Sequence, residues 1–97
     1  PEEYHVLENI VQLDEAYFKN WCLIMGKQIG SKKLAYDLIY KSHPGRLQAN
    51  SFLFQKVQPG ATLWTDGASI YKRSEDYWPV EHTADIQKVR IRTYERN

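Results

Sequence analysis

Three β-rich runs follow one another in the first 40 residues, and this order constrains the possible folds more than any other feature of the chain. Residues 9–18, 21–25 and 34–40 are rich in the aliphatic, β-branched and aromatic side chains that favour strands. Gly30 and Ser31 lie between the second and third runs, and glycine readily adopts the positive φ of a tight turn. The sequence therefore predicts three consecutive antiparallel strands.

Helical and strand patterns alternate in the second half of the chain. Pro44 interrupts the strand pattern, because proline cannot donate a hydrogen bond to a sheet. Residues 46–57 are predicted to form a helix that ends before Pro59, with an apolar stripe made of Leu47, Leu53, Phe54 and Val57. Further predictions are a buried strand at 61–65, a second helix at about 68–77, a fifth strand at 78–82 and a last helix that starts near Thr93.

The resulting order, β-β-β-α-β-α-β, predicts the fold class. Strands joined by hairpins and then by helical crossovers form a mixed sheet with helices on its faces, so we expect an α/β fold with about five strands. Asp14 would lie on the first strand and Asp66 at the end of the fourth. If these strands are neighbours in the sheet, the two carboxylates come side by side. Glu15 would face the opposite side of the sheet, in a surface or supporting role.

Length and composition indicate one globular domain. The chain has 97 residues, of which 42% are hydrophobic and 26% are charged, as in ordinary globular proteins rather than disordered or fibrous ones. Because residue 1 is Pro rather than Met, we expect residues 1–97 to be a fragment of a longer protein. No run reaches the ~18 apolar residues of a membrane span and no signal peptide opens the chain, so we expect no membrane partner.

The single cysteine, Cys22, excludes a disulfide or a Cys-rich zinc site within the chain. We therefore expect a reducing, cytoplasmic location and a buried, unreactive Cys22. His5 and His43 have no ligand-like spacing with another histidine, so a zinc site is not expected.

Charge is unevenly distributed, although the formal net charge is only +1. The first 18 residues contain five acidic residues and neither Lys nor Arg, whereas residues 88–97 are basic. Clustered acids beside a basic stretch suit a site that holds metal and grips phosphate, although solvated surface charge would give the same pattern. Arg90, Arg92 and Arg96 are the candidates for binding DNA phosphates.

Two carboxylates on adjacent strands are the central candidate site. Neighbouring carboxylates repel each other, and a divalent cation between them removes this cost. Mg²⁺ binds one or two carboxylates together with water and substrate phosphate, and with a third acid two ions can assist an in-line displacement at a phosphodiester. Asp14 and Asp66 are the first two acids, and Asp85 and Glu81 are alternatives for the third.

Four segments resemble the catalytic domain of bacterial insertion-sequence transposases of the DDE superfamily. They are residues 11–18 (Val-Gln-Leu-Asp-Glu-Ala-Tyr-Phe), residues 64–67 (Trp-Thr-Asp-Gly) with Tyr71, residues 81–82 (Glu-His) and residues 94–97 (Tyr-Glu-Arg-Asn). The resemblance implies an RNase H-like fold, which agrees with the predicted strand order. It also implies two Mg²⁺ or Mn²⁺ ions, hydrolysis of a phosphodiester at the element end, and transfer of the freed 3′-hydroxyl to target DNA.

The resemblance also implies roles for individual residues. Asp14 is similar to the first metal-binding catalytic acid, Asp66 to the second and Glu95 to the third. His82 resembles a histidine that lies between the second and third acids in related elements. The family's last helix normally continues well past its glutamate, so the fragment alone could fold without being active.

Three functions stay open at this point. The leading hypothesis is the catalytic core of a DNA transposase, which acts on element ends and target DNA and could assemble as a homo-oligomer. The second is a noncatalytic nucleic-acid-binding or assembly module with the same fold. The third is a two-metal nuclease without strand transfer. The sequence does not give the DNA specificity or the oligomeric state.

Overall fold

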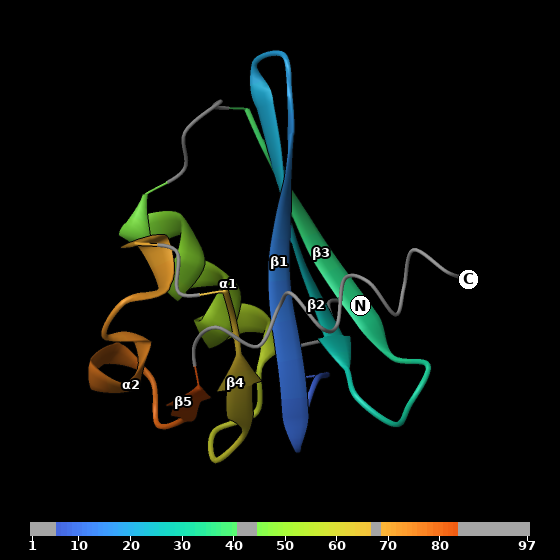
Figure 1. The fold of residues 1–97 in the computed structure, drawn as a ribbon, viewed down its shortest axis with the longest axis vertical. Helices are drawn as coiled ribbons and strands as arrows, with labels where there is room; N and C mark the ends of the chain where they lie inside the picture. The colour runs from blue at the N-terminus through green and yellow to red at the C-terminus, as the bar shows by residue number, and fades with distance from the viewer. Residues whose placement is uncertain (1–5, 41–44, 67–68, 84–97) are drawn as a thin grey trace.

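The computed structural model describes residues 6–40, 45–66 and 69–83. Five strands and three short helical segments follow one another along the chain (Figure 1): β1 (Ile10–Phe18), β2 (Trp21–Gln28), β3 (Leu34–Ile39), α1 (Arg46–Lys56), β4 (Thr62–Trp64), the 3₁₀ turn η1 (Ser69–Tyr71), α2 (Ser74–Tyr77) and β5 (Glu81–Thr83). The strands form one mixed sheet, so the predicted fold class is confirmed and is consistent with an RNase H-like fold. The helix predicted near Thr93 lies outside the described residues.

The first three strands form the antiparallel arrangement that the sequence predicts. β1 pairs with β2, and β2 pairs with β3, both antiparallel. Asn20 in the first turn has a φ of 70°, and Gly30 in the second has a φ of 81°. Glycine and asparagine adopt this left-handed conformation at the lowest cost, so the two turns follow from local sequence.

β1 lies at the centre of the sheet, whose strand order is β3-β2-β1-β4-β5. β4 pairs parallel to β1 on the side away from β2, and β5 pairs parallel to β4. Parallel neighbours need crossover connections, and α1 lies in the first of these while η1 and α2 lie in the second. This topology places β4 beside the first three residues of β1.

One face of the sheet packs against α1, and we call it the helix-covered face (Figure 1). Gly26 makes this close approach feasible: a Cβ there would lie 2.8 Å from Leu7 Cδ1 and 3.1 Å from Phe52 Cε1. Gly26 pairs with Leu13 of β1, so the space left by the missing side chain of Gly26 lies beside the central strand. The core around it consists of Leu7, Val11, Leu13, Ile24, Ala49, Phe52, Leu53 and Leu63 among other buried side chains.

The buried side of α1 differs from the predicted stripe. Ala49, Phe52 and Leu53 are buried, whereas Leu47 is 79% exposed and Phe54 is 51% exposed. Positions 49, 52 and 53 have the i, i+3, i+4 spacing of a single helix face. Phe52 fills the space above Gly26, and this contact selects the side of the helix that faces the sheet.

The second helix, predicted at 68–77, is divided into two short pieces. η1 ends at Tyr71, and α2 begins at Ser74 after Arg73, whose φ is 62°. A left-handed residue cannot continue a right-handed helix, so Arg73 ends the helical run between the pieces. The Ser74 hydroxyl donates a hydrogen bond of 2.7 Å to the Tyr71 carbonyl and closes the connection.

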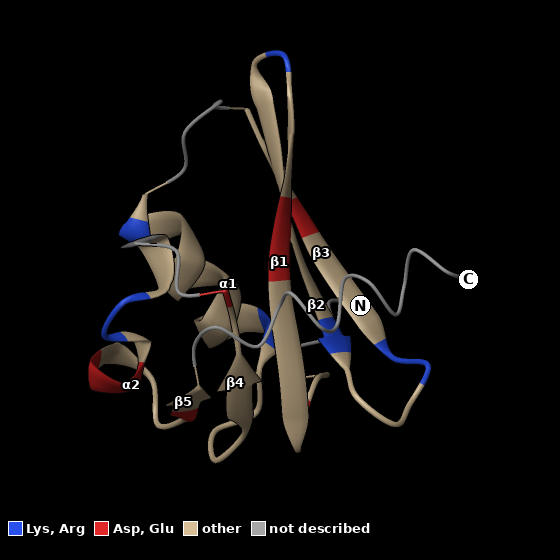
Figure 2. Cartoon of the chain, viewed as in Figure 1, with Lys and Arg blue, Asp and Glu red and all other residues tan. Residues whose placement is uncertain are grey.

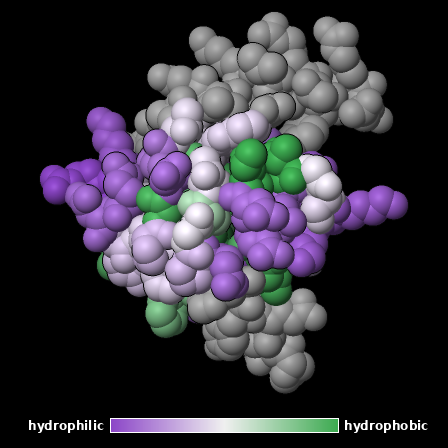
Figure 3. Space-filling model, turned by 90° about the horizontal axis from the view of Figure 1, so that it is seen from below, coloured by the Kyte–Doolittle hydropathy of each residue, from purple (hydrophilic) through white to green (hydrophobic). Residues whose placement is uncertain are grey.

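The opposite side of the sheet, called here the second face, carries the alternate residues of β1, β2 and β3. Leu34, Tyr36 and Leu38 of β3 lie on it and are all more than half exposed. Gln12 and Asp14 of β1 also lie on this face, because successive strand residues point to opposite sides. Seen from below, the coloured surface of the molecule has hydrophobic areas between hydrophilic ones (Figure 3).

Two single features complete the description. Cys22 is fully buried, as predicted. Within residues 6–40, 45–66 and 69–83, no helix has the length and apolar character needed to cross a membrane.

Candidate functional site

The strands that carry Asp14 and Asp66 are neighbours in the sheet. β1 and β4 pair in parallel register, and the last pair is Gln12 with Trp64. Continued by two residues, this register brings Asp14 level with Asp66, and adjacent strands lie about 4.8 Å apart. Both acids are partly buried. The structure therefore confirms that the strand carrying Asp14 and the strand that Asp66 follows are neighbours, while the carboxylate pair and its metal binding stay predictions.

Asp14 is oriented by its own backbone. Its Oδ1 atom accepts a hydrogen bond of 2.8 Å from the backbone N–H of Glu15. β1 and β4 contain no Lys or Arg, so neither of these strands supplies a cation to the acids that they carry. Figure 2 shows the acidic segment of β1 as a red band, with the basic residues of the segment from β1 to β3 at its turns and strand ends. An oriented carboxylate is a suitable ligand for a cation. Lys27 of β2 lines a cavity together with Asp14 and is a positive charge at this site.

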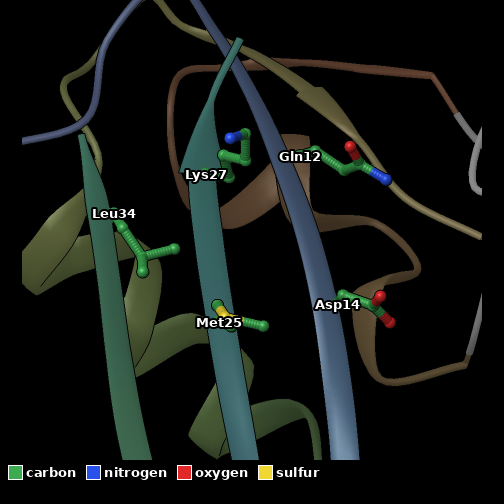
Figure 4. Close-up of a pocket in the computed structure, with 5 residues that line it drawn as sticks. All are labelled: Gln12, Asp14, Met25, Lys27 and Leu34. Atoms are coloured by element: carbon green, nitrogen blue, oxygen red, sulfur yellow. The ribbon is translucent and has the colours of Figure 1, made fainter. Parts of the chain in front are cut away.

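A cavity of about 280 Å³ adjoins Asp14 on the second face (Figure 4). Two side chains come from β1, two from β2 and one from β3: Gln12, Asp14, Met25, Lys27 and Leu34. In Figure 4 the side chains of Gln12 and Asp14 extend from the same side of β1. The sequence analysis did not predict this cavity, because it depends on the register that places Gln12 beside Lys27 and Lys27 beside Leu34.

Glu15 and Tyr71 form a contact that the sequence analysis missed. The Tyr71 hydroxyl donates a hydrogen bond of 2.7 Å to Glu15 Oε1. Tyr71 is fully buried, and Glu15 lies on the helix-covered face because it pairs with the buried Ile24. The predicted orientation of Glu15, away from the face of Asp14, is therefore confirmed. In the sequence, the one indication of Tyr71 is its place in the motif that begins with residues 64–67.

The electrostatic environment of Glu15 is unfavourable for its charge. Partial burial raises the pKa of the Glu15 carboxyl, and the nearby charges of Asp66 and Asp14 raise it further, while the Tyr71 hydrogen bond opposes the rise. Burial and the bond to Glu15 also raise the pKa of Tyr71, which keeps its hydroxyl protonated and donating. The pKa of Glu15 is therefore coupled to the charges of both candidate metal-binding acids.

The raised pKa of Glu15 predicts a pH-dependent stability in metal-free protein. A carboxyl whose pKa is higher in the folded state stabilises the fold below its unfolded pKa, about 4.3, and that stability is lost as pH rises through the folded pKa. Glu15→Gln removes the ionisation and keeps an oxygen acceptor for Tyr71. We expect the variant to be more stable than wild type at pH 7 by up to about 1 kcal/mol, because solvent screens a partly exposed charge. Urea denaturation at pH 4 and pH 7 with a chelator present measures the difference.

Glu81→Gln is the matched control for this prediction, because Glu81 is exposed on β5. It should change stability equally at the two pH values. An advantage of Glu15→Gln that is the same at pH 4 and pH 7 would show that the charge of Glu15 is not the cause.

His82 lies beside the residue that precedes Asp66. Its Nε2 atom is hydrogen-bonded to Thr65 Oγ1 at 2.7 Å, and its Nδ1 atom is 3.4 Å from Glu75 Oε1. His82 pairs with Leu63 in the β4–β5 ladder, which places its side chain on the helix-covered face rather than on the face of Asp14. His82 therefore makes a structural contact with Thr65. The catalytic role predicted for His82 stays a prediction.

Other predicted site residues lie outside the described residues. These are Glu95, the alternative third acid Asp85, and the candidate DNA-binding residues Arg90, Arg92 and Arg96. Glu81, the other alternative, is exposed at the start of β5. In the part of the chain that the structure describes, no group of three or more His, Cys, Asp or Glu residues is arranged to hold a metal ion. The described residues thus supply two acids of the predicted three.

Comparison with known proteins finds likeness in structure and not in sequence. No protein-family model matches the chain, and no curated protein matches it. Among solved structures, it is similar to a chain of a simian T-cell lymphotropic virus intasome in complex with PP2A regulatory subunit B56 gamma, with a TM-score of 0.62 and 15% sequence identity. The match covers 92% of this chain and 38% of that chain. At this identity the likeness shows a shared fold, and the resemblance to bacterial insertion-sequence transposases stays a prediction.

Proposed function

We propose that the protein provides the catalytic core of a DDE-type DNA transposase. The observation that supports this proposal is the adjacency of parallel strands β1 and β4, whose last pair, Gln12 with Trp64, lies two residues before Asp14 and Asp66. The structural neighbour is described as an intasome, which supports a role in DNA recombination. Element ends, target DNA and further copies of the chain are the partners that this function requires.

The donor set fits a hard divalent cation. Asp14 and Asp66 would supply one carboxylate each, and Mg²⁺ commonly takes one or two carboxylates with water and substrate phosphate. Bound Mg²⁺ or Mn²⁺ ions would activate the attacking oxygen and stabilise the leaving oxygen of an in-line displacement. Glu95 would be the third ligand, and Arg90, Arg92 and Arg96 would bind DNA phosphates.

The chain's own residues prepare this site before any substrate binds. The Glu15 N–H holds the Asp14 carboxylate close to β1. Asp14 lies on β1 and Asp66 follows β4 by two residues, so both acids are attached to one sheet through paired strands. Burial is the largest cause of the raised pKa of Glu15, and repulsion from the carboxylates of Asp66 and Asp14 raises this pKa further. A bound cation would reduce the repulsion.

Calorimetric titration of the full-length protein with Mn²⁺ tests the metal site. Wild type should bind, and Asp14→Asn should lower the affinity at least about tenfold, since even outer-shell changes at metal sites cost 10–100-fold. Asp37→Asn on β3 is the control, because Asp37 pairs with Ile24 on the helix-covered face. It should bind Mn²⁺ like wild type. Unchanged affinity in Asp14→Asn would sink the proposal.

A noncatalytic module with the same fold is the second candidate function. The observation in its favour is that the described residues contribute no complete group of three metal-binding side chains. A module of this kind would bind DNA with no change on addition of Mn²⁺ and would show no Mn²⁺ heat that Asp14→Asn removes. A two-metal nuclease would behave like the transposase in this titration and would differ in lacking strand transfer.

A further inference from the structure

We propose that the hydrogen bond between Tyr71 and Glu15 is a positioning clamp, which holds the segment that follows Asp66 against β1 and so fixes Asp66 relative to Asp14. This inference rests on the proposed function, because it assigns the clamp to the same metal site. Tyr71 and Glu15 act here as positioning residues. Neither would touch the metal or the DNA.

Backbone pairing alone does not reach Asp66 from β1. The last β1–β4 pair is Gln12 with Trp64, two residues before Asp66. On the other side, the Thr65 N–H still donates to the Thr83 carbonyl at 3.0 Å, so this part of the chain stays tied to β5. A side-chain tie to β1 beyond the last ladder pair would further restrict the position of Asp66 relative to Asp14.

The Tyr71–Glu15 hydrogen bond supplies that tie. Tyr71 ends η1, which begins three residues after Asp66, and its hydroxyl reaches Glu15 at 2.7 Å. Glu15 is the residue next to Asp14, so the bond joins the neighbourhoods of the two acids across 56 positions of sequence. The Tyr71 end is itself fixed, because its ring is fully buried and its carbonyl accepts the bond from Ser74.

The clamp and the acid pair lie on opposite sides of β1. Consecutive strand residues face opposite sides, so Glu15 meets Tyr71 on the helix-covered face while Asp14 faces the cavity on the second face. The clamp can therefore fix the backbone without occupying space needed by metal or substrate. A hydrogen bond to a carboxylate in a partly buried site is stronger and shorter than a neutral one, which suits a fixed tie.

Four substitutions separate positioning from charge and from general packing. Tyr71→Phe removes the hydroxyl and keeps the ring and the Glu15 charge. Glu15→Gln removes the charge and keeps an acceptor for Tyr71. Tyr77→Phe is the matched control, because it deletes the same hydroxyl group from a tyrosine that is 48% exposed. Glu15→Ala removes the acceptor from the partly exposed partner, and so tests the clamp even if Tyr71→Phe fails to fold.

The readouts are amide hydrogen exchange at Asp66 and Ile70 without metal, and Mn²⁺ affinity, both in the full-length protein. Tyr71→Phe and Glu15→Ala should speed exchange at these amides about tenfold, the change expected for loss of one buried hydrogen bond. Tyr71→Phe should weaken Mn²⁺ binding about tenfold, as loss of outer-shell positioning does at other metal sites. Tyr77→Phe should behave like wild type in both measurements. Glu15→Gln should exchange like wild type because it keeps the acceptor for Tyr71.

Two results would overturn the clamp. One is wild-type exchange at Asp66 in both Tyr71→Phe and Glu15→Ala. The other is a Mn²⁺ affinity in Tyr71→Phe equal to that of Tyr77→Phe, which would show that the Tyr71 hydroxyl does not position the acids. If wild-type protein binds no Mn²⁺, the proposed function fails instead, and the exchange measurement alone decides whether the clamp exists.

Discussion

Asp66→Asn in the full-length protein should lower metal-dependent cleavage of element-end DNA at least about a hundredfold, because removal of outer-shell partners alone costs 10–100-fold at metal sites. The amide oxygen of Asn is a neutral and weaker ligand for a hard divalent cation than a carboxylate. Folding should be retained, since Asp66 is only partly buried and follows β4 rather than lying in the core. Single-turnover cleavage of a labelled DNA end in Mg²⁺ measures the effect.

Asp76→Asn is the control for this loss of activity. Asp76 is exposed on α2 and pairs with Arg73, so its substitution changes the same functional group away from the acid pair. Its cleavage rate should equal that of wild type. The double variant Asp14→Asn/Asp66→Asn should cleave DNA no more slowly than either single variant, because two ligands of one site act as a unit. Cleavage by Asp66→Asn at the wild-type rate would remove Asp66 from the site.

Phe52→Ala should destabilise the fold by about 3–5 kcal/mol, the usual cost of truncating a buried aromatic residue. Phe52 is 1% exposed, and its ring packs over Gly26 of β2. Because small domains are stable by only about 5–15 kcal/mol, this substitution removes a large share of the total. Urea denaturation should show a lower midpoint with an unchanged slope.

Phe54→Ala on the same helix provides a matched comparison. Phe54 is 51% exposed, and its ring meets Trp78 edge to face at a centroid distance of 5.3 Å. An aromatic pair of this kind contributes about 0.5–1.5 kcal/mol beyond its buried area, so the variant should lose far less stability than Phe52→Ala. Equal losses in the two variants would contradict the observed orientation of α1.

The order of elements could be predicted because its signals are local. Alternating apolar residues, the Gly30 turn and the Pro44 break each act within a few residues, and they give the correct sequence of strands and helices. The orientation of α1 is not local. Leu47 and Phe54 are as hydrophobic as Phe52, and only the space above Gly26, distant in sequence, selects Phe52 for the core.

The same distinction applies to the candidate site. Asp14 and Asp66 could be selected from the sequence because each follows an apolar strand pattern, and the strand order makes β1 and β4 neighbours as predicted. The contact of Tyr71 with Glu15 has no comparable signal, since it joins side chains 56 positions apart in the sequence. Periodicity predicted one continuous helix there and so could not place the tyrosine hydroxyl.

The central position of β1 restricts which changes in chain length the protein can accept. β1 is paired on both sides, antiparallel to β2 and parallel to β4, so it cannot shift along one neighbour without losing its pairing to the other. Loss of a single residue between Ile10 and Asp14 would reverse the sides to which Asp14 and Glu15 point. An acidic side chain would still face the cavity, yet Tyr71 would lose its acceptor. Substitutions in this strand are therefore easier to accommodate than insertions or deletions, and its length should vary less than that of the β2–β3 turn.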